Sequence, residues 1–358
     1  MQAQATQTLE LLDWYDLNAR SLPWRIEPKR SKNGVKQDPY RVWLSEIMLQ
    51  QTTVATVTPY FEKFTAAWPR VQDIAAASDQ EIRAAWAGLG YYRRAANLHA
   101  CAKEVAARGG RFPSTAAELI KLPGIGAYTS AAIASIAFGE AVPVVDGNVE
   151  RVISRLCSID TPLPNAKAEI TVHLGQLVPD DRPGDFAQAL MDLGATICKP
   201  KAPECGKCPW EAHCTAKWAG NVEDFPNKPA KRPKPSRYGS AIVKIRPTDG
   251  ALWCEVRADE GLLPGMTQVP TSDWRAEAPL PARGDLLGQV SHTFTHFQLT
   301  LDVYSDDNFV PEPGTGFWCK PADLGLHGWP TVMIKVLQLA DPRLARLARS
   351  KVANARAK

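Results

Sequence analysis

The chain has 358 residues, more than one hydrophobic core usually supports, so we expect two domains. Its hydrophobic fraction of 45% and charged fraction of 22% exclude a largely disordered or fibrous protein. The net charge of +4 permits nucleic-acid binding without requiring it, because the local distribution of charge matters more than the sum. No secretion signal is visible and no apolar run approaches the roughly 18 residues of a membrane-spanning helix, so we expect a cytoplasmic protein.

Apolar residues recur at helical spacing through residues 8–222, which predicts a mainly α N-terminal region. The clearest predicted helices are 42–51, 60–67, 80–87, 93–107 and 127–138. After them, residues 226–237 hold four prolines and five basic residues without an acid, a composition typical of an extended linker. Short β-rich runs follow, and then a helix near 330–340, which together predict a small α+β domain. The predicted strands are 240–246, 251–257 and 297–304.

The segment of residues 39–52, PYRVWLSEIMLQQT, places one carboxyl group among apolar neighbours. Glu46 stands beside Leu44 and Ile47 on a predicted helix. Removal from water would raise the pKa of this carboxyl group and keep it protonated near neutral pH, as a general acid requires. From this segment alone, an exposed helical glutamate is an equally good interpretation.

Residues 122–129 read LPGIGAYT and precede an Ala-rich helix. Gly124 and Gly126 allow the backbone to approach a phosphate, whose charge the free amides of the helix start would receive. This pattern indicates a helix–hairpin–helix element. Asp146 follows at the start of another apolar helix, where it can cap the helix or stabilise positive charge on a sugar whose base departs.

Four of the eight cysteines lie within 17 residues with the spacing C-x6-C-x2-C-x5-C. Structural zinc sites usually pair two tight C-x2-C turns, and only one occurs here. Four thiolates around one centre suit a [4Fe–4S] cluster, so we expect this cofactor in a structural or DNA-positioning role. The predicted ligands are Cys198, Cys205, Cys208 and Cys214.

The hairpin followed by Asp146 resembles the helix–hairpin–helix, Gly/Pro–Asp superfamily of DNA glycosylases, and residues 39–52 resemble its MutY-type adenine DNA glycosylases. The resemblance implies that Glu46 protonates N7 of adenine and that Asp146, with Asn148 beside it, faces the target nucleotide. Strand-cleaving relatives place a lysine where this chain has Tyr128, so the resemblance implies a monofunctional enzyme. Tyr128 would instead hold Asp146 or the sugar by a hydrogen bond, or simply pack in the hairpin.

The same resemblance implies further contacts to DNA. Trp24 and Arg25 match a segment that lines the adenine pocket, and Gln188 falls where a polar residue contacts the flipped base. Core packing remains an alternative for Trp24. Tyr91 and Gln51 resemble residues that wedge into the base stack, which offsets part of the cost of base extrusion. Leu49, on the helix of Glu46, is also placed in the binding surface.

The C-terminal region resembles the Nudix-like domain of these glycosylases. Phe294, Thr295 and His296 match its loop that inspects 8-oxoguanine, usually written Phe-Ser-His, with threonine here in place of serine. Residues 261–270 resemble a further family stretch, with its Trp, Glu and Phe replaced. We find no Glu-rich Nudix box in residues 238–345, so pyrophosphate hydrolysis is not expected.

The sequence therefore predicts a monomeric adenine glycosylase that acts on double-stranded DNA with adenine opposite 8-oxoguanine or guanine, in a bacterial cell associated with the nucleoid. A related glycosylase for another base and a non-catalytic DNA damage-binding protein remain as alternatives. The expected fold is a mainly α glycosylase region of two helical subdomains with the cluster, followed by the α+β domain. The expected parts are the glycosylase domain 1–222, the linker 223–237, the Nudix-like domain 238–345 and a basic tail 346–358.

Overall fold

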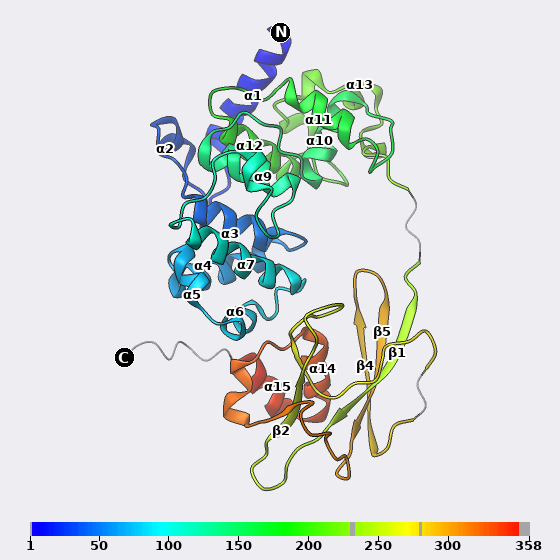
Figure 1. Cartoon of the computed structure of the whole chain (residues 1–358). Coiled ribbons are helices and arrows are strands. Elements are labelled where there is room, and N and C mark those ends of the chain that lie inside the picture. The colour runs from blue at the N-terminus through cyan, green and yellow to red at the C-terminus, as the bar shows by residue number, and fades with distance from the viewer. Residues whose placement is uncertain (1, 230–232, 279–280, 351–358) are drawn as a thin grey trace. The chain divides into compact units, whose positions relative to one another are not determined.

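The computed structural model describes residues 2–229, 233–278 and 281–350 (Figure 1). The chain divides into two compact units. The first unit comprises Met1–Thr65, Arg70–Gln72 and Cys101–Lys231, and the second comprises Ala66–Pro69, Asp73–Ala100 and Arg232–Lys358. A helical segment of the N-terminal half thus groups with the C-terminal half. The domain limits expected from the sequence stay a prediction.

The first unit is helical. Its main helices are α1 (Gln2–Asn18), α2 (Pro28–Lys32), α3 (Pro39–Leu49), α4 (Val54–Ala67), α8 (Ala116–Leu119), α9 (Ala127–Ile133), the π-helical turn η1 (Ala134–Phe138), α10 (Gly147–Cys157), α11 (Lys167–Gly175), α12 (Pro183–Thr196) and α13 (Thr215–Ala219). Short 3-10 turns cover Cys205–Lys207, Glu211–His213 and Val222–Asp224. No helix among the described residues is long and apolar enough to cross a membrane.

Local capping explains where the two helices that carry carboxyl groups begin. Asp38 accepts a hydrogen bond from the Tyr40 amide, and Pro39 occupies the first turn of α3, where a missing amide costs nothing. Asp146 caps α10 by accepting from the amides of Asn148 and Val149. These caps fix the starting points of the helices that supply Glu46 and Asp146.

One apolar core holds much of the first unit together. Helix α12 lies at its centre and packs against α1, α10 and η1. Its buried members include Leu11, Tyr15, Ile153, Phe186 and Trp210. Because α12 is buried over most of its length, polar side chains on it are buried as well, and each of them requires a hydrogen-bonding partner.

The second unit joins helices to two small sheets. Its helices are α5 (Val71–Ala76), α6 (Asp79–Trp86), α7 (Arg93–Ala107), α14 (Thr331–Ala340), α15 (Pro342–Arg349) and the 3-10 turn Pro321–Leu326. Residues 71–72 of α5 and 101–107 of α7 are grouped with the first unit. Its strands are β1 (Ser236–Val243), β2 (Leu252–Val256), β3 (Thr267–Gln268), β4 (Asp285–Thr293), β5 (Gln298–Ser305) and β6 (Phe317–Cys319). One sheet has the order β1-β5-β4, with β1 and β5 parallel, and the other has the order β3-β2-β6.

The mainly α first unit and the α+β C-terminal region agree with the fold class predicted from the sequence. Helix α14 packs on β4, β5 and β1, and α15 packs on α14 through the buried Leu344 and Ala345. Helix α15 runs to Arg349, so the beginning of the expected basic tail is helical. Residues 351–358 of that tail and residues 230–232 of the expected linker lie outside the described residues.

Candidate active site

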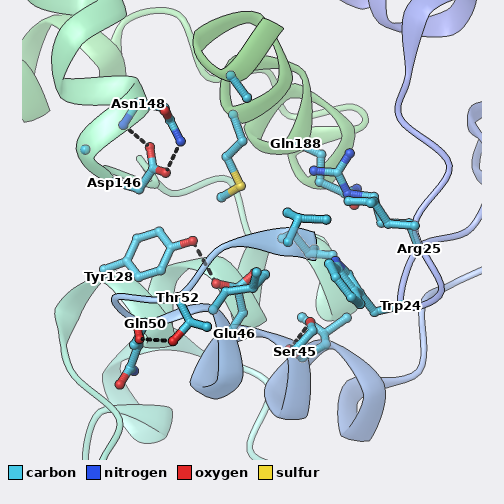
Figure 2. Close-up of a pocket in the computed structure, with 18 of the residues that line it drawn as sticks. Trp24, Arg25, Ser45, Glu46, Gln50, Thr52, Tyr128, Asp146, Asn148 and Gln188 are labelled. Atoms are coloured by element: carbon cyan, nitrogen blue, oxygen red, sulfur yellow. Dashed lines mark hydrogen bonds between the residues drawn. The ribbon is translucent and has the colours of Figure 1, made fainter. Parts of the chain in front are cut away.

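A cavity of about 540 Å³ opens in the first unit between segments that are far apart in the sequence (Figure 2). The segment before α3, helix α3 itself, the start of α9, the start of α10 and helix α12 all contribute to its wall. The residues predicted from the sequence that line it are Trp24, Arg25, Glu46, Leu49, Gln51, Tyr128, Asp146, Asn148 and Gln188. The structure therefore brings nine predicted site residues together in one cavity.

Glu46 extends from α3 into this cavity with only 6% of its surface exposed. Burial raises the pKa of Glu46 to about 7, because the charged form loses its hydration. A hydrogen bond from Tyr128 and the charge of Arg25 oppose this rise, whereas the negative charge of Asp146 adds to it. Glu46 is thus a carboxyl group that holds its proton near neutral pH.

Tyr128 donates a hydrogen bond from its hydroxyl to Oε2 of Glu46, over 2.7 Å. Of the partners expected for Tyr128, which were Asp146 or the sugar, Asp146 does not receive this hydrogen bond, because the hydroxyl faces the other carboxyl group (Figure 2). Burial raises the pKa of Tyr128 well above its ordinary value, so the phenol remains a donor. Tyr128 lies one residue inside α9, directly after the hairpin.

Asp146 forms three hydrogen bonds at the start of α10. Its Oδ1 accepts from the amides of Asn148 and Val149 over 2.9 and 2.7 Å, and its Oδ2 accepts from the side chain of Asn148 over 2.9 Å. The pKa of Asp146 is raised above its ordinary value by burial, and these hydrogen bonds limit the rise. The helix start also stabilises negative charge at this position, so capping the helix does not exclude the role predicted for Asp146.

Asn148 is held in place by α12 and by an arginine. Nη2 of Arg151 donates to Oδ1 of Asn148 over 3.0 Å and to the carbonyl of Gly194 over 2.6 Å. A Cβ atom on Gly194 would lie 2.7 Å from Cβ of Asn148, closer than real Cβ contacts, so glycine permits this approach. The orientation of Asn148 therefore depends on a residue that sequence reasoning did not single out.

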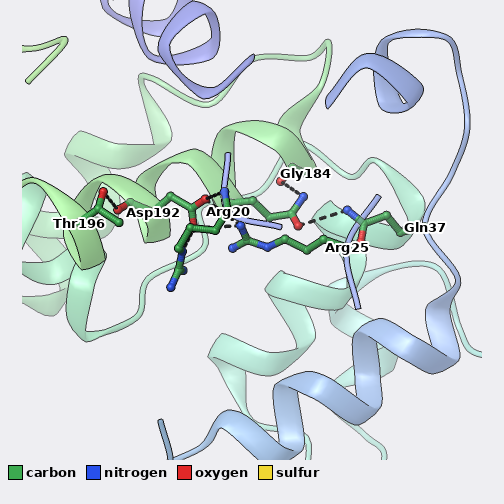
Figure 3. Close-up of polar contacts among 7 residues, drawn as sticks. Arg20, Arg25, Gln37, Gly184, Asp192 and Thr196 are labelled. Carbon is green, nitrogen blue, oxygen red and sulfur yellow. Dashed lines mark hydrogen bonds and ion pairs between the residues drawn. The ribbon is translucent and has the colours of Figure 1, made fainter. Parts of the chain in front are cut away.

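Two arginines that line the cavity, Arg20 and Arg25, bind a carboxylate on α12, Asp192, whose side chain is fully buried (Figure 3). Nε of Arg20 donates to Oδ1 of Asp192 over 2.7 Å, and the Arg20 amide donates to Oδ2 over 2.9 Å. Nη1 of Arg25 donates to both oxygens, over 2.9 and 2.8 Å. The sequence analysis named Arg25 and missed both Arg20 and Asp192.

Trp24 belongs to the cavity wall and to the core at the same time. Its ring packs edge-on against Phe61 of α4 with a centroid distance of 5.3 Å, and only 6% of the residue is exposed. Gln188 on α12 is 2% exposed and lines the cavity. It accepts a hydrogen bond from Gln37, a further residue that the sequence analysis missed.

The other predicted DNA-contacting residues of this half of the chain lie on exposed backbone turns. Gly124 has a φ of +73°, which favours glycine, and Gly126 is the exposed residue before α9. Gln51 and Tyr91 also adopt positive φ values, of +58° and +48°. Such backbone conformations are costly for residues other than glycine and occur preferentially at functional sites.

The predicted lesion-inspecting loop, residues 294–297, is the tight connection between β4 and β5 of the second unit. Thr295 and His296 are exposed, whereas Phe294 packs against the rings of Trp274 and Phe297. Within the same unit, Oγ1 of Thr295 donates to the hydroxyl oxygen of Tyr91 over 3.1 Å. The tyrosine proposed as a wedge and this loop thus contact each other.

The four clustered cysteines are free and half-buried around α13 and the neighbouring 3-10 turns. The pKa of Cys208 is raised to about 12, mainly by burial and in part by the charges of Cys198, Cys214 and Cys205. The sulfur atoms of Cys198 and Cys214 both contact Arg155, over 3.4 Å each. Among the described residues, no three His, Cys, Asp or Glu side chains form a ready-made set for a single metal ion.

Arg155 organises the cysteine-rich loop from inside the core. It is 1% exposed, and it donates to Sγ of Cys198 over 3.4 Å and to the carbonyls of Lys199 and Pro200 over 2.7 and 3.0 Å. The sequence signal for it was weak, since an arginine within the apolar face of α10 is noticeable only once that face is known to be buried.

Two family models match the chain. Residues 44–179 match the model described as HhH-GPD superfamily base excision DNA repair protein, and residues 241–339 match the NUDIX domain model. The first match contains Glu46, Tyr128 and Asp146, and the second contains the loop of residues 294–297.

Curated relatives and a solved structure extend these matches. The adenine DNA glycosylase of Homo sapiens is 38% identical over 362 residues, which cover 82% of this chain and 65% of the human protein, slightly less than two thirds of its length. The adenine DNA glycosylase of Buchnera aphidicola subsp. Schizaphis graminum is 31% identical and covers 92% of this chain and 97% of that protein. The structure of a thermostable thymine-DNA glycosylase is 31% identical, covers 61% of this chain and 98% of its own, and superimposes with a TM-score of 0.53.

Proposed function

This chain belongs to the family of adenine DNA glycosylases, and on that premise we propose that it removes adenine mispaired with 8-oxoguanine or guanine from double-stranded DNA. The observation that carries the proposal is one cavity that holds two carboxyl groups with different environments. Glu46 is buried and has a pKa of about 7, whereas Asp146 accepts three hydrogen bonds that favour its ionised form.

Glu46 and Asp146 have different roles in the proposed reaction. Glu46 donates its proton to N7 of the extruded adenine, so that the base leaves as a neutral molecule when the N-glycosidic bond breaks. Asp146 carries the negative charge that stabilises the cationic sugar left behind, until water adds to C1′ and loses a proton. A purine is required for this step, because a pyrimidine such as thymine has no N7 to protonate.

We propose a monofunctional enzyme that leaves an abasic site. Tyr128 stands where strand-cleaving relatives would need an amine, and a phenol cannot form a Schiff base with the sugar. Lys167 also lines the cavity, but its ammonium group pairs with Glu150 over 2.9 Å. A charged, paired ammonium group is not a nucleophile, which supports hydrolysis over lyase chemistry.

The pH dependence of adenine release should reflect both carboxyl groups. The rate should fall as the pH rises through about 7, because Glu46 loses its proton, and it should fall in acid, where Asp146 becomes protonated. Tyr128→Phe removes a donor that stabilises ionised Glu46, so the pKa of Glu46 should rise and the alkaline limb should move to higher pH. Single-turnover rates measured across the pH range test this. An alkaline limb that stays in place or moves to lower pH would contradict the assignment of Glu46.

DNA contacts are proposed for the exposed turns. The backbone amides around Gly124 and Gly126 would hold a phosphate, Gln51 and Tyr91 would enter the base stack, and the loop that contains Phe294, Thr295 and His296 would inspect the opposite base. Affinity for duplex DNA should therefore fall with added salt, since phosphate contacts release counterions.

We propose that Cys198, Cys205, Cys208 and Cys214 hold a [4Fe–4S] cluster. The donor set fits this group: the four cysteines are half-buried, and the charges of Cys198, Cys205 and Cys214 act on Cys208. When bound, the cluster would supply cross-links that order the loop after α12, and a structural role follows.

Cys208→Ser should therefore abolish binding of most of the iron. If the lost cross-link contributes about 2 kcal/mol, the melting temperature should fall by roughly 4–8 °C. Iron and sulfide analysis and a thermal melt measure the two effects. Cys157→Ser is the matched control, because this half-buried cysteine lies near Cys214 but outside the proposed set. Equal iron content in both variants would contradict the ligand set.

A glycosylase assay tests the function directly. Duplexes that contain A opposite 8-oxoguanine, A opposite G, and T opposite G are incubated with the protein and then cleaved with alkali at abasic sites. Adenine should be released from the first two duplexes and thymine should remain in the third. Release of thymine alone would favour the activity named for the thymine-DNA glycosylase relative, and duplex binding without release would favour a DNA damage-binding protein.

A further inference from the structure

Gln37 is a buried glutamine that the proposed chemistry does not use. It precedes α3 by two residues, only 6% of it is exposed, and it lines the same cavity as Glu46. Glutamine is seldom buried, because its amide must find partners to replace water. Its burial beside the cavity therefore calls for a physical reason.

A short chain of hydrogen bonds links Gln37 to α12 (Figure 3). Nε2 of Gln37 donates to Oε1 of Gln188 over 3.2 Å, and Nε2 of Gln188 donates to the carbonyl of Gly184 over 3.2 Å. A backbone carbonyl can only accept, so the nitrogen end of the Gln188 amide must face Gly184. The oxygen end of Gln188 then faces Gln37, and Gln37 must present its nitrogen to it.

The position of Gly184 makes this anchor rigid. A Cβ atom at Gly184 would lie 2.7 Å from both Cα of Ile136 and the carbonyl oxygen of Ser135, so only glycine lets α12 approach η1 this closely. The carbonyl that receives Gln188 is thus fixed by backbone packing. This fixed carbonyl sets the orientation of the Gln188 amide, and the Gln188 oxygen sets the orientation of the Gln37 amide.

This direction leaves one group unsatisfied. Oε1 of Gln37 is buried and has no hydrogen-bond partner among the described residues. Turning the Gln37 amide would place its oxygen against Oε1 of Gln188, so the unsatisfied acceptor cannot be avoided without breaking the link. Unsatisfied buried acceptors are unfavourable and are retained mainly at functional sites.

We propose that Gln37 is a specificity-determining positioning residue, which holds the carbonyl oxygen of Gln188 toward the cavity so that the site accepts a base with an exocyclic amino group and rejects one with a carbonyl at that position. The inference rests on the proposed function and names the residue that selects adenine within it. Gln188 keeps a second lone pair on Oε1 for this contact, because Gln37 uses only one.

The pattern of hydrogen-bond donors and acceptors that the site selects matches one edge of adenine. Adenine presents its N6 amino group as a donor next to N7 as an acceptor, whereas guanine presents O6 and N7, both acceptors. Protonated Glu46 supplies a donor for N7, and Gln188 supplies an acceptor for the amino group. A 6-carbonyl would face the oxygen of Gln188 and repel it. Gln37 and the Gly184 carbonyl, one at each end of the Gln188 amide, together prevent the amide from turning to accommodate the carbonyl.

The test compares release of adenine with release of hypoxanthine, which carries a carbonyl in place of the amino group. Both bases are placed opposite guanine in otherwise identical duplexes, and single-turnover rates are measured for the wild-type protein and Gln37→Met. Methionine has a similar volume and no amide. The adenine-to-hypoxanthine rate ratio should fall by about tenfold or more in the variant, because Gln188 then keeps only the bond to the Gly184 carbonyl of the two hydrogen bonds that orient its amide.

Four further variants make the result decisive. Gln37→Glu cannot donate to Gln188 when ionised, so it should lower the ratio as well, and it serves if Gln37→Met fails to fold. Gln188→Met and the double variant should show effects that do not multiply, as expected for two residues acting as one unit. Gln176→Met, an exposed change outside the cavity, should leave the ratio unchanged.

The possible outcomes distinguish failure of the role assigned to Gln37 from failure of the proposed function. An unchanged ratio in both Gln37 variants, with adenine release intact, would overturn the role of Gln37 and leave the proposed function standing. Multiplicative effects of Gln37→Met and Gln188→Met would also overturn it. If the wild-type protein released neither base, the proposed function would fail, and the selection that rests on it would fail too.

Discussion

Replacing Glu46 with glutamine should abolish detectable adenine release while duplex binding stays close to that of the wild-type protein. The introduced amide keeps the shape of the side chain but has no acidic proton to give to adenine N7. General acid catalysis contributes about 10²–10⁴-fold, so we expect a loss of roughly 10³-fold or more in the single-turnover rate. Because the proposed contact of Glu46 is to the base and not to the DNA backbone, the affinity for duplex DNA should change little.

The same variant has a second readout in stability. The pKa of Glu46 is raised by folding to about 7, so its contribution to stability is complete below its unfolded-state pKa and is lost as the pH rises through about 7. The melting temperature of the wild-type protein should therefore decline through neutral pH more than that of Glu46→Gln. Glu62→Gln, an exposed change on α4, is the matched control for both readouts. Adenine release by Glu46→Gln at the control's rate would exclude Glu46 as the proton donor.

Replacing Asp192 with asparagine should cause a large loss of stability. Asp192 is fully buried and forms ion pairs with two arginines, Arg20 and Arg25, so it offsets part of their positive charge. Asparagine would place amide donors against guanidinium donors and leave positive charge without a partner. Removing one member of a buried ion pair typically costs about 3–5 kcal/mol, which a denaturant unfolding curve would measure.

Asp192→Asn should also change the pH dependence of adenine release, because Arg25 acts on the pKa of Glu46. The charge of Arg25 lowers the pKa of Glu46, and Asp192 offsets part of that charge in the wild-type protein. Without Asp192, the ionised form of Glu46 is favoured, so the alkaline limb of adenine release should move to lower pH. Asp180→Asn, an exposed aspartate before α12, should affect neither measurement. Unfolding free energies equal for the two variants would contradict the assigned role of Asp192.

Local sequence signals determined much of the architecture. Helix α3 begins at Pro39, directly after its capping residue Asp38, and α10 begins directly after its capping residue Asp146. At both helix starts, the controlling interaction is formed by residues within a few positions of one another. The sequence left an exposed glutamate equally possible at position 46, and burial in the tertiary structure is what raises the pKa of Glu46. The predicted roles of the site residues stay predictions.

Only the tertiary structure decided which distant side chains meet. Asp192 holds arginines 167 and 172 positions away, and Gln37 bonds to Gln188 across 151 positions. The hydroxyl of Tyr128 contacts Glu46, 82 positions earlier, rather than the nearer Asp146. Neither the spacing of apolar residues nor a helix-capping residue predicts such pairs from the sequence. They form because the packing of α12 against its neighbours buries polar groups from different segments together, and each group must then find its partner inside the fold.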